Sequence, residues 1–215
     1  MRPPSDEVLD LFAVPGAVPL PGGHDRSVVA GDLVLTPGRD LAVQEWLSPL
    51  LARLAVTMDS RPSRRPLDLR IAVPVPARDG AWVVEGWAAC RYEPGSVATR
   101  DLDVTLAAGR VLHAELASWV PVRPPALAAA EPGPDRPGQL VHTELFGNVL
   151  LDAYGAPVVI DVRPAWAPPA WAEALCVLDA VADGAAPAEV LARFATPAER
   201  DVLGRAQELR RLSPR

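Results

Sequence analysis

The hydrophobic pattern of residues 1–90 predicts short strands that pair as hairpins. Runs of valine and leucine at residues 28–30 and 33–35 flank a Gly-Asp pair, which turns easily. A second pair of runs, at residues 71–77 and 81–88, flanks an Arg-Asp-Gly turn and is rich in the valines and tryptophans that strands favour. Both segments are therefore predicted to be antiparallel hairpins.

The apolar residues follow a helical spacing between the two predicted hairpins, and again after the second hairpin. Within residues 40–56, leucines and a tryptophan recur at the spacing of one helix face. Pro49 must either kink this helix or mark its first turn, because a proline inside a helix removes a hydrogen bond. Residues 102–119 predict a longer helix, which is followed by a proline.

The second half of the chain begins with a proline-rich link at residues 121–138, where prolines are too dense for a helix or a central strand. After it come short apolar runs at residues 139–141, 149–151 and 158–160. A turn is predicted at residues 152–157. From residue 169 onward the pattern predicts three helical pieces, which break near Gly184 and Pro197.

This order of elements predicts an α+β fold of two lobes rather than a repeating β-α-β sheet. A length of 215 residues, of which 49% are hydrophobic, allows one domain of ordinary size or two small lobes. We expect a β-rich N-terminal lobe over residues 1–90 and a mainly helical C-terminal lobe over residues 91–215.

Charge and composition narrow the possible partners. The net charge is −6, and the densest basic stretch, residues 61–70, mixes four arginines with prolines, as a solvated loop does. Nucleic-acid binding is therefore not expected. The first residues lack a signal-peptide core and no apolar run approaches about eighteen residues, so we expect a cytoplasmic protein without membrane contact. Cys90 and Cys176 match no metal-ligand spacing.

All 21 basic side chains are arginines, and the chain contains no lysine. Schiff-base formation, a P-loop lysine and a lysine general base each need an amine or a compact ammonium group. Arginine, which stays protonated, does not replace that group. These mechanisms are therefore excluded.

Polar residues gather at the ends of the apolar runs between residues 140 and 161. They are His142, Glu144, Asn148 and Asp161. If strands bury the apolar runs, the carboxylates and the amide converge, and such oxygen ligands suit a hard cation such as Mg²⁺. The alternative is that these side chains satisfy backbone groups at the ends of hairpins.

The same segment resembles the catalytic loop of the aminoglycoside and choline phosphotransferases, which are relatives of the protein kinases. The resemblance rests on His142-Thr143-Glu144, on Asn148, and on the apolar run that ends in Ile160-Asp161. Within that family it looks most similar to small actinobacterial phosphotransferase-like proteins. The resemblance implies a protein-kinase-like fold of reduced size. Outside residues 140–161 the resemblance continues over nearly the whole chain, but it is less specific there.

The resemblance also implies roles for individual residues. Asn148 and Asp161 would hold Mg²⁺ on the phosphates of ATP or GTP, and Glu144 would accept the proton of a small-molecule hydroxyl. His142 would orient the loop. Gly22, Gly23 and Thr36 would lie against the nucleotide, and Glu45 would stand on the helix of the N-terminal lobe.

Three departures from the family pattern weaken the expected activity. Glu144 replaces an aspartate, and an extra methylene displaces the carboxylate by about 1 Å. Only three residues separate Glu144 from Asn148 where kinases have four, although Gly147 could compensate by an unusual φ. Thr36 stands where a phosphate-binding lysine is expected.

Two hypotheses follow from this combination. The first is a slow phosphotransferase that acts on a small-molecule acceptor. The second is an inactive pseudokinase that binds a nucleotide or a protein partner. An accidental match would instead leave Asn148 and Asp161 far apart in the fold.

Other polar residues have simpler interpretations. His24 is expected in an exposed loop and His113 in helix packing. Asp179 and Asp183, four residues apart on a late helix, are expected to face solvent.

Overall fold

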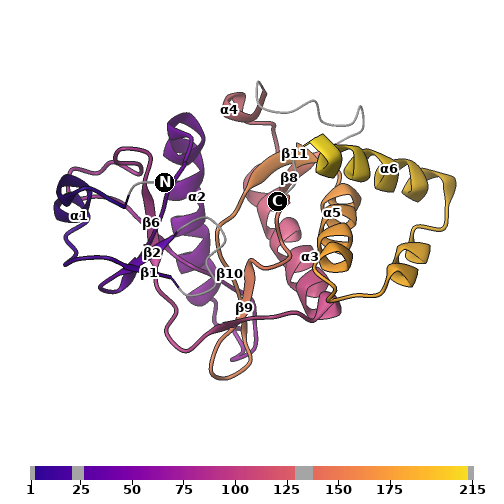
Figure 1. Cartoon of the computed structure of the whole chain (residues 1–215), viewed down its shortest axis with the longest axis horizontal. Coiled ribbons are helices and arrows are strands. Elements are labelled where there is room, and N and C mark those ends of the chain that lie inside the picture. The colour runs from indigo at the N-terminus through magenta and orange to yellow at the C-terminus, as the bar shows by residue number, and fades with distance from the viewer. Residues whose placement is uncertain (1–2, 21–26, 129–137, 213–215) are drawn as a thin grey trace. The chain divides into compact units, whose positions relative to one another are not determined.

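A computed structural model describes residues 3–20, 27–128 and 138–212 of the chain. The chain divides into two compact units (Figure 1). Unit one comprises residues 1–65 and 70–95, and unit two comprises residues 66–69 and 96–215. Strands and helices are mixed, so the predicted α+β class is confirmed.

Unit one is built on an antiparallel sheet with strand order β1-β2-β3-β6-β5. The strands of unit one are β1 (Val18–Pro19), β2 (Val28–Ala30), β3 (Leu33–Thr36), β4 (Arg70–Ile71), β5 (Pro74–Val75) and β6 (Ala88–Arg91). The hairpin predicted at residues 28–35 is confirmed as β2 and β3, which pair with Val29 opposite Val34. The apolar residues of β2 and β3 pack with Val8 and Phe12 in one buried cluster.

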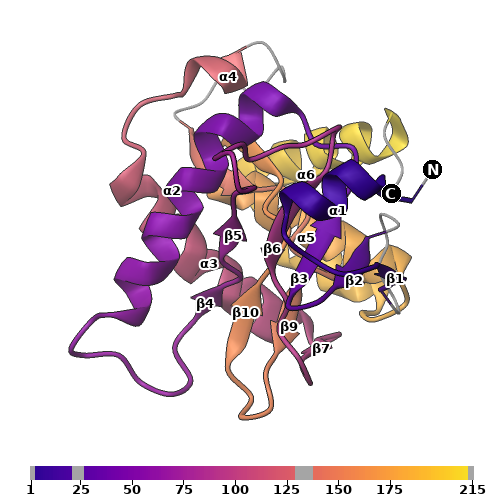
Figure 2. The ribbon, with the colours of Figure 1, turned by 90° about the vertical axis from the view of Figure 1, so that its left-hand side faces the viewer.

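Two helices complete unit one (Figure 2). Helix α1 (Asp6–Leu11) supplies Val8 to the buried cluster, and α2 (Leu41–Asp59) packs against β4 and β5. The side chain of Asp40 caps α2, because its Oδ1 accepts the Val43 N–H at 2.8 Å. The helix therefore begins before Pro49, and the alternative start at that proline was wrong.

The predicted second hairpin differs from the structure in its second strand. The Arg-Asp-Gly turn forms, with the Ala77 N–H donating to the Ala81 carbonyl at 2.8 Å. A further tight turn then follows, in which Glu85 and Gly86 both have positive φ, at 48° and 79°. Two such residues in succession are typical of a two-residue hairpin turn. Regular strand structure resumes only at β6, so residues 81–88 are not one continuous strand.

Unit two combines two small sheets with packed helices. Its strands are β7 (Val97–Ala98), β8 (Gln139–His142), β9 (Val149–Leu151), β10 (Pro157–Val159) and β11 (Pro164–Ala167). Its helices are α3 (Leu102–Trp119), α4 (Pro125–Ala128), α5 (Pro169–Ala182), the 3₁₀ helix η1 (Ala188–Arg193) and α6 (Pro197–Leu212). Helix α3 packs on β8 and α5, and α5 packs on α6 (Figure 1). Among the described residues, no helix is both long and apolar enough to cross a membrane.

The predicted helix at residues 102–119 and the three helical pieces after residue 169 are confirmed. Two shorter elements were predicted wrongly. The proline-rich link contains the single turn α4, which starts at Pro125, where a missing N–H costs nothing. Strand β11 was missed because it begins with Pro164, a residue that strands accept at their first position.

Candidate functional site

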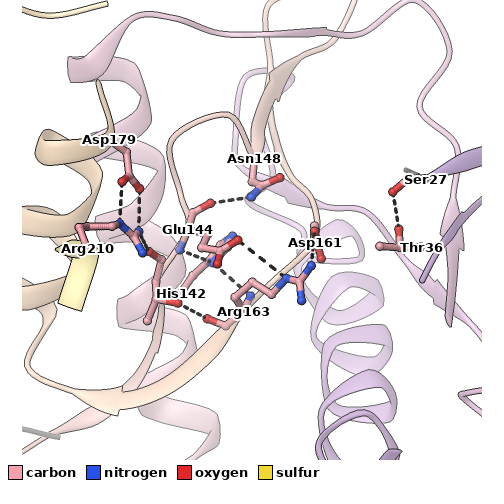
Figure 3. Close-up of polar contacts among 10 residues, drawn as sticks. Ser27, Thr36, His142, Glu144, Asn148, Asp161, Arg163, Asp179 and Arg210 are labelled. Atoms are coloured by element: carbon pink, nitrogen blue, oxygen red, sulfur yellow. Dashed lines mark hydrogen bonds and ion pairs between the residues drawn. The ribbon is translucent and has the colours of Figure 1, made fainter. Parts of the chain in front are cut away.

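The β9–β10 hairpin brings Asn148 and Asp161 together (Figure 3). In its register Val159 lies opposite Val149, and the Ile160 N–H donates to the Asn148 carbonyl at 3.0 Å. Asn148 therefore precedes one strand at the same end of the hairpin where Asp161 follows the other. The interpretation of the motif as an accidental match predicted that these residues lie far apart, and that separation is not found.

Asp161 has an unusual backbone conformation. Its φ is +49°, one of three positive φ values among the described non-glycine residues. A non-glycine residue in this region costs of order 1 kcal/mol and is retained where the surrounding structure enforces it, often at functional sites. The strain therefore marks the position where the chain turns from β10 toward β11.

The segment between Glu144 and Asn148 forms a tight turn. The Asn148 N–H donates to the Leu145 carbonyl at 2.9 Å, and the Asn148 Nδ2 donates to the Glu144 carbonyl at 2.6 Å. Gly147 has φ +85°, which confirms that the glycine takes a conformation other residues rarely adopt. A turn at Gly147 thus accommodates the three-residue spacing between Glu144 and Asn148, and the side-chain amide of Asn148 stabilises this turn.

His142 links the two segments that carry the carboxylates. Its ring is fully buried, and its Nδ1 accepts the N–H of Glu144 and the N–H of Arg163, both at 3.2 Å. Because Nδ1 accepts, this arrangement assigns the ring proton to Nε2. The imidazole therefore positions residues 144 and 163 together, which is an orienting role and needs no proton transfer.

A second buried histidine supports the first. The His142 N–H donates to Nε2 of His113 on α3 at 3.0 Å, and the His113 carbonyl accepts from the Gln139 side chain at 2.7 Å. Burial lowers the pKa of His113 to about 4, while the charge of Glu173 opposes this shift. His113 is therefore neutral near pH 7. Its side chain is buried, so the prediction that it is a packing residue of the helix is confirmed.

Arg163 is a site residue that sequence reasoning missed. Its Nε lies 3.9 Å from Oε2 of Glu144, and its Nη2 lies 3.5 Å from Oδ2 of Asp161 (Figure 3). The three side chains are partly exposed, at 28% for Arg163, 32% for Glu144 and 18% for Asp161. The signal in the sequence was an arginine two residues after the strand-end aspartate, which places opposite charges in one neighbourhood.

Asp179 corrects the prediction that both late aspartates face solvent. It is buried and accepts two hydrogen bonds from Arg210, from Nε and from Nη2, each at 2.7 Å. The Nη2 of Arg210 also donates to the Thr143 carbonyl at 3.0 Å, inside the loop (Figure 3). Packing of α5 on α6 takes Asp179 out of water. Asp183 is exposed as predicted and pairs with Arg100.

The structure describes only some of the unit-one residues that were predicted to lie near a nucleotide. Thr36 ends β3 and is buried, and its hydroxyl shares a hydrogen bond of 3.1 Å with the Ser27 hydroxyl (Figure 3). Glu45 is exposed on α2. Gly22 and Gly23 lie outside the described residues, as does His24. A nucleotide contact at any of these positions stays a prediction.

The donor atoms near the hairpin end fit Mg²⁺. Asp161 supplies a carboxylate, and Asn148 supplies an amide oxygen because its nitrogen is already bonded to a carbonyl. Within residues 3–20, 27–128 and 138–212, no three His, Cys, Asp or Glu side chains gather into a metal site. Mg²⁺ typically takes one or two protein carboxylates and completes its shell with water and phosphate oxygens, so this donor set suits a metal that arrives with a nucleotide.

Comparison with known proteins yields likenesses among solved structures alone. No protein-family model matches the sequence, and no curated protein does so. Among solved structures, the chain is similar to a choline/ethanolamine kinase family protein from Mesorhizobium loti. The two share 13% sequence identity over 89% of this chain and 68% of that chain, with a TM-score of 0.41. A likeness of this degree leaves the chemistry to be argued from the residues of this chain.

Proposed function

We propose that this chain is a kinase-like protein that binds a magnesium nucleotide and transfers its γ-phosphoryl group slowly to the hydroxyl of a small molecule. The observation that carries the proposal is how the segments of Glu144, Asn148 and Asp161 are tied together. The His142 ring binds the backbone of residues 144 and 163, Asn148 binds the Glu144 carbonyl, and the hairpin register brings Asn148 close to Asp161. A loop held by backbone bonds on both sides has the rigidity that phosphoryl transfer needs, because this reaction depends on positioning and electrostatics.

Each residue has one task in the proposed reaction. The acceptor oxygen forms a bond to the γ-phosphorus, the bond from that phosphorus to the β-bridging oxygen breaks, and Glu144 takes the hydroxyl proton. Asn148 and Asp161 would hold Mg²⁺, and the positive charge that the ion supplies when bound would offset that of the phosphate oxygens. His142 keeps the backbone of Glu144 fixed relative to that of Arg163. The sequence predicts only that the acceptor is a small molecule with a hydroxyl group, and a panel of such compounds identifies its type.

A second candidate function is an inactive pseudokinase that binds a nucleotide without turnover. Two observations favour it. Arg163 forms ion pairs with the carboxylates proposed as base and metal ligand. Thr36, at the end of β3, brings no positive charge where the resemblance expects a lysine. Loss of that cation weakens the electrostatic stabilisation on which transfer depends.

Calorimetric titration with MgATP and MgGTP tests the proposal, using the wild-type chain and an Asp161→Asn variant. Asparagine keeps the size of the side chain and tolerates a positive φ, so the backbone is preserved while the charge is removed. We expect nucleotide binding that falls at least about tenfold in the variant. Asp183→Asn is the matched control, because it makes the same change at an exposed ion pair and should bind as the wild type does.

Turnover separates the two candidates. Release of ADP in the presence of hydroxyl compounds, reduced by about 10²-fold or more in Glu144→Gln, supports the phosphotransferase. Nucleotide binding that needs Asp161 but produces no ADP with any acceptor supports the pseudokinase. Absence of nucleotide binding to the wild-type chain would rule out the phosphotransferase and the nucleotide-binding pseudokinase, and would leave only a scaffold that binds a protein partner.

A further inference from the structure

The ion pairs of Arg163 place a permanent positive charge at the proposed metal ligand. Its guanidinium contacts Oδ2 of Asp161 and Oε2 of Glu144, at 3.5 and 3.9 Å. We propose that Arg163 is a built-in cation that competes with the divalent metal for Asp161 and so sets the metal affinity of the site. This inference rests on the proposed function for its biological meaning, while the competition itself is a property of these three side chains.

The backbone of Arg163 is held in place by three hydrogen bonds. Its N–H donates to His142 Nδ1 at 3.2 Å, and its carbonyl accepts from the N–H and from the hydroxyl of Thr143, at 3.0 and 3.2 Å. The Cα of residue 163 is therefore fixed beside the loop. The side chain is 28% exposed, which gives the guanidinium a path into solvent.

The chemistry of the guanidinium makes the competition persistent. Arginine stays protonated throughout the accessible pH range, so a change of pH does not remove the positive charge. A divalent ion bound to Asp161 would lie within a few ångströms of that charge, and like charges at such a distance repel strongly in a partly buried site. Metal binding consequently requires the Arg163 side chain to leave Asp161.

Replacing Arg163 with an uncharged residue should therefore tighten metal binding. Mn²⁺ serves as the probe, because free Mn²⁺ is measured directly by electron paramagnetic resonance during a titration without nucleotide. For Arg163→Gln we expect the dissociation constant of Mn²⁺ to fall by at least about tenfold relative to the wild type. The double variant Arg163→Gln/Asp161→Asn should lose that gain, because the contested carboxylate is gone.

A matched control separates the local effect from the change in net charge. Arg110 in unit two pairs with Glu173 through two hydrogen bonds of 2.9 Å, and 61% of its side chain is exposed. Arg110→Gln changes the net charge by the same amount and should leave the Mn²⁺ affinity within about twofold of the wild type. Thermal melting of each variant shows whether it is folded, and Arg163→Met is the second choice if the glutamine variant is not.

The inference is overturned if neither uncharged variant binds Mn²⁺ more tightly than the wild type. It is also overturned if Arg110→Gln produces the same gain, since bulk charge would then explain the effect. These outcomes are distinguishable from failure of the proposed function, which the MgATP titration decides separately. A tightened Mn²⁺ affinity with no nucleotide binding would leave the competition established and the phosphotransferase rejected.

Discussion

At the scale of single residues, the buried imidazoles of His113 and His142 hold the backbone of the loop that carries Glu144. The backbone N–H of His142 donates to the ring of His113, and the ring of His142 accepts from the segments that carry Glu144 and Arg163. Both rings act as acceptors for backbone donors. Protonation of the His113 ring would therefore break the hydrogen bond that this ring accepts from the His142 N–H.

His113 should therefore make stability depend on pH. Its pKa is about 4 in the folded chain and about 6.5 when unfolded, so between these values the unfolded state binds more protons. Stability is complete above about pH 6.5 and is lost as the pH falls toward 4. The contribution should amount to about 2 kcal/mol between pH 7 and pH 5. Urea unfolding at several pH values measures it.

The control for this prediction is His113→Asn, which does not titrate in the same range. The difference in unfolding free energy between wild type and variant should shrink by about 2 kcal/mol from pH 7 to pH 5. A constant difference across that range would contradict the assignment of this pH dependence to His113.

At the scale of elements, the close approach of α3 to the loop depends on a glycine. A Cβ built at Gly109 would lie 2.5 Å from Cδ1 of Leu145, the residue that follows Glu144, and Leu145 is almost fully buried. A glycine inside a helix costs about 1 kcal/mol relative to alanine. The packing of the loop explains why this helix keeps one.

Gly109→Ala should consequently destabilise the fold by about 1 to 2 kcal/mol, because displacement of a buried leucine outweighs the gain in helix propensity. The matched control is Gly204→Ala on α6, where the added methyl group meets no atom within 4 Å beyond its chain neighbours and the backbone of its own helix. That variant should gain up to about 1 kcal/mol. Chemical denaturation measures the unfolding free energy of both variants. A stabilised Gly109→Ala would contradict the prediction, because it would show that Leu145 can move aside at little cost.

The elements of the site differ in how far the sequence could predict them. The β9–β10 hairpin and helix α3 have local signals, namely paired apolar runs and a helical period, and both were predicted. Arg163 had only a weak local signal, its place two residues after Asp161, and Arg210 had none, because solvated arginines and ion-paired ones share the same local pattern. Their partners are fixed by packing, and Arg210 lies 31 residues from Asp179 in the chain.

At the scale of the whole molecule, the absence of lysine makes arginine the cation in every contact between basic side chains and carboxylates. Each guanidinium offers a planar set of donors that can hold two acceptors at once. Arg210 uses this property fully, because it binds both oxygens of Asp179 and the carbonyl of Thr143. A lysine at this position would not reproduce the three bonds.

Arg210→Met should lower the unfolding free energy by about 3 to 5 kcal/mol, because it leaves the buried carboxylate of Asp179 without its cation. The double variant Arg210→Met/Asp179→Leu should recover most of that loss. Arg211→Met, at an exposed neighbouring pair, should change stability by less than about 1 kcal/mol. Equal effects at residues 210 and 211, measured by urea denaturation, would contradict the buried ion pair.

The bond from Arg210 to Thr143 also has a consequence for the newly made chain. The two residues are 67 positions apart, and a ribosome adds roughly 5 to 20 residues per second. Several seconds of synthesis therefore pass after the loop has been made before its arginine partner exists. During that interval the Thr143 carbonyl is held by no guanidinium from α6, so completion of the loop waits for synthesis of the last described helix.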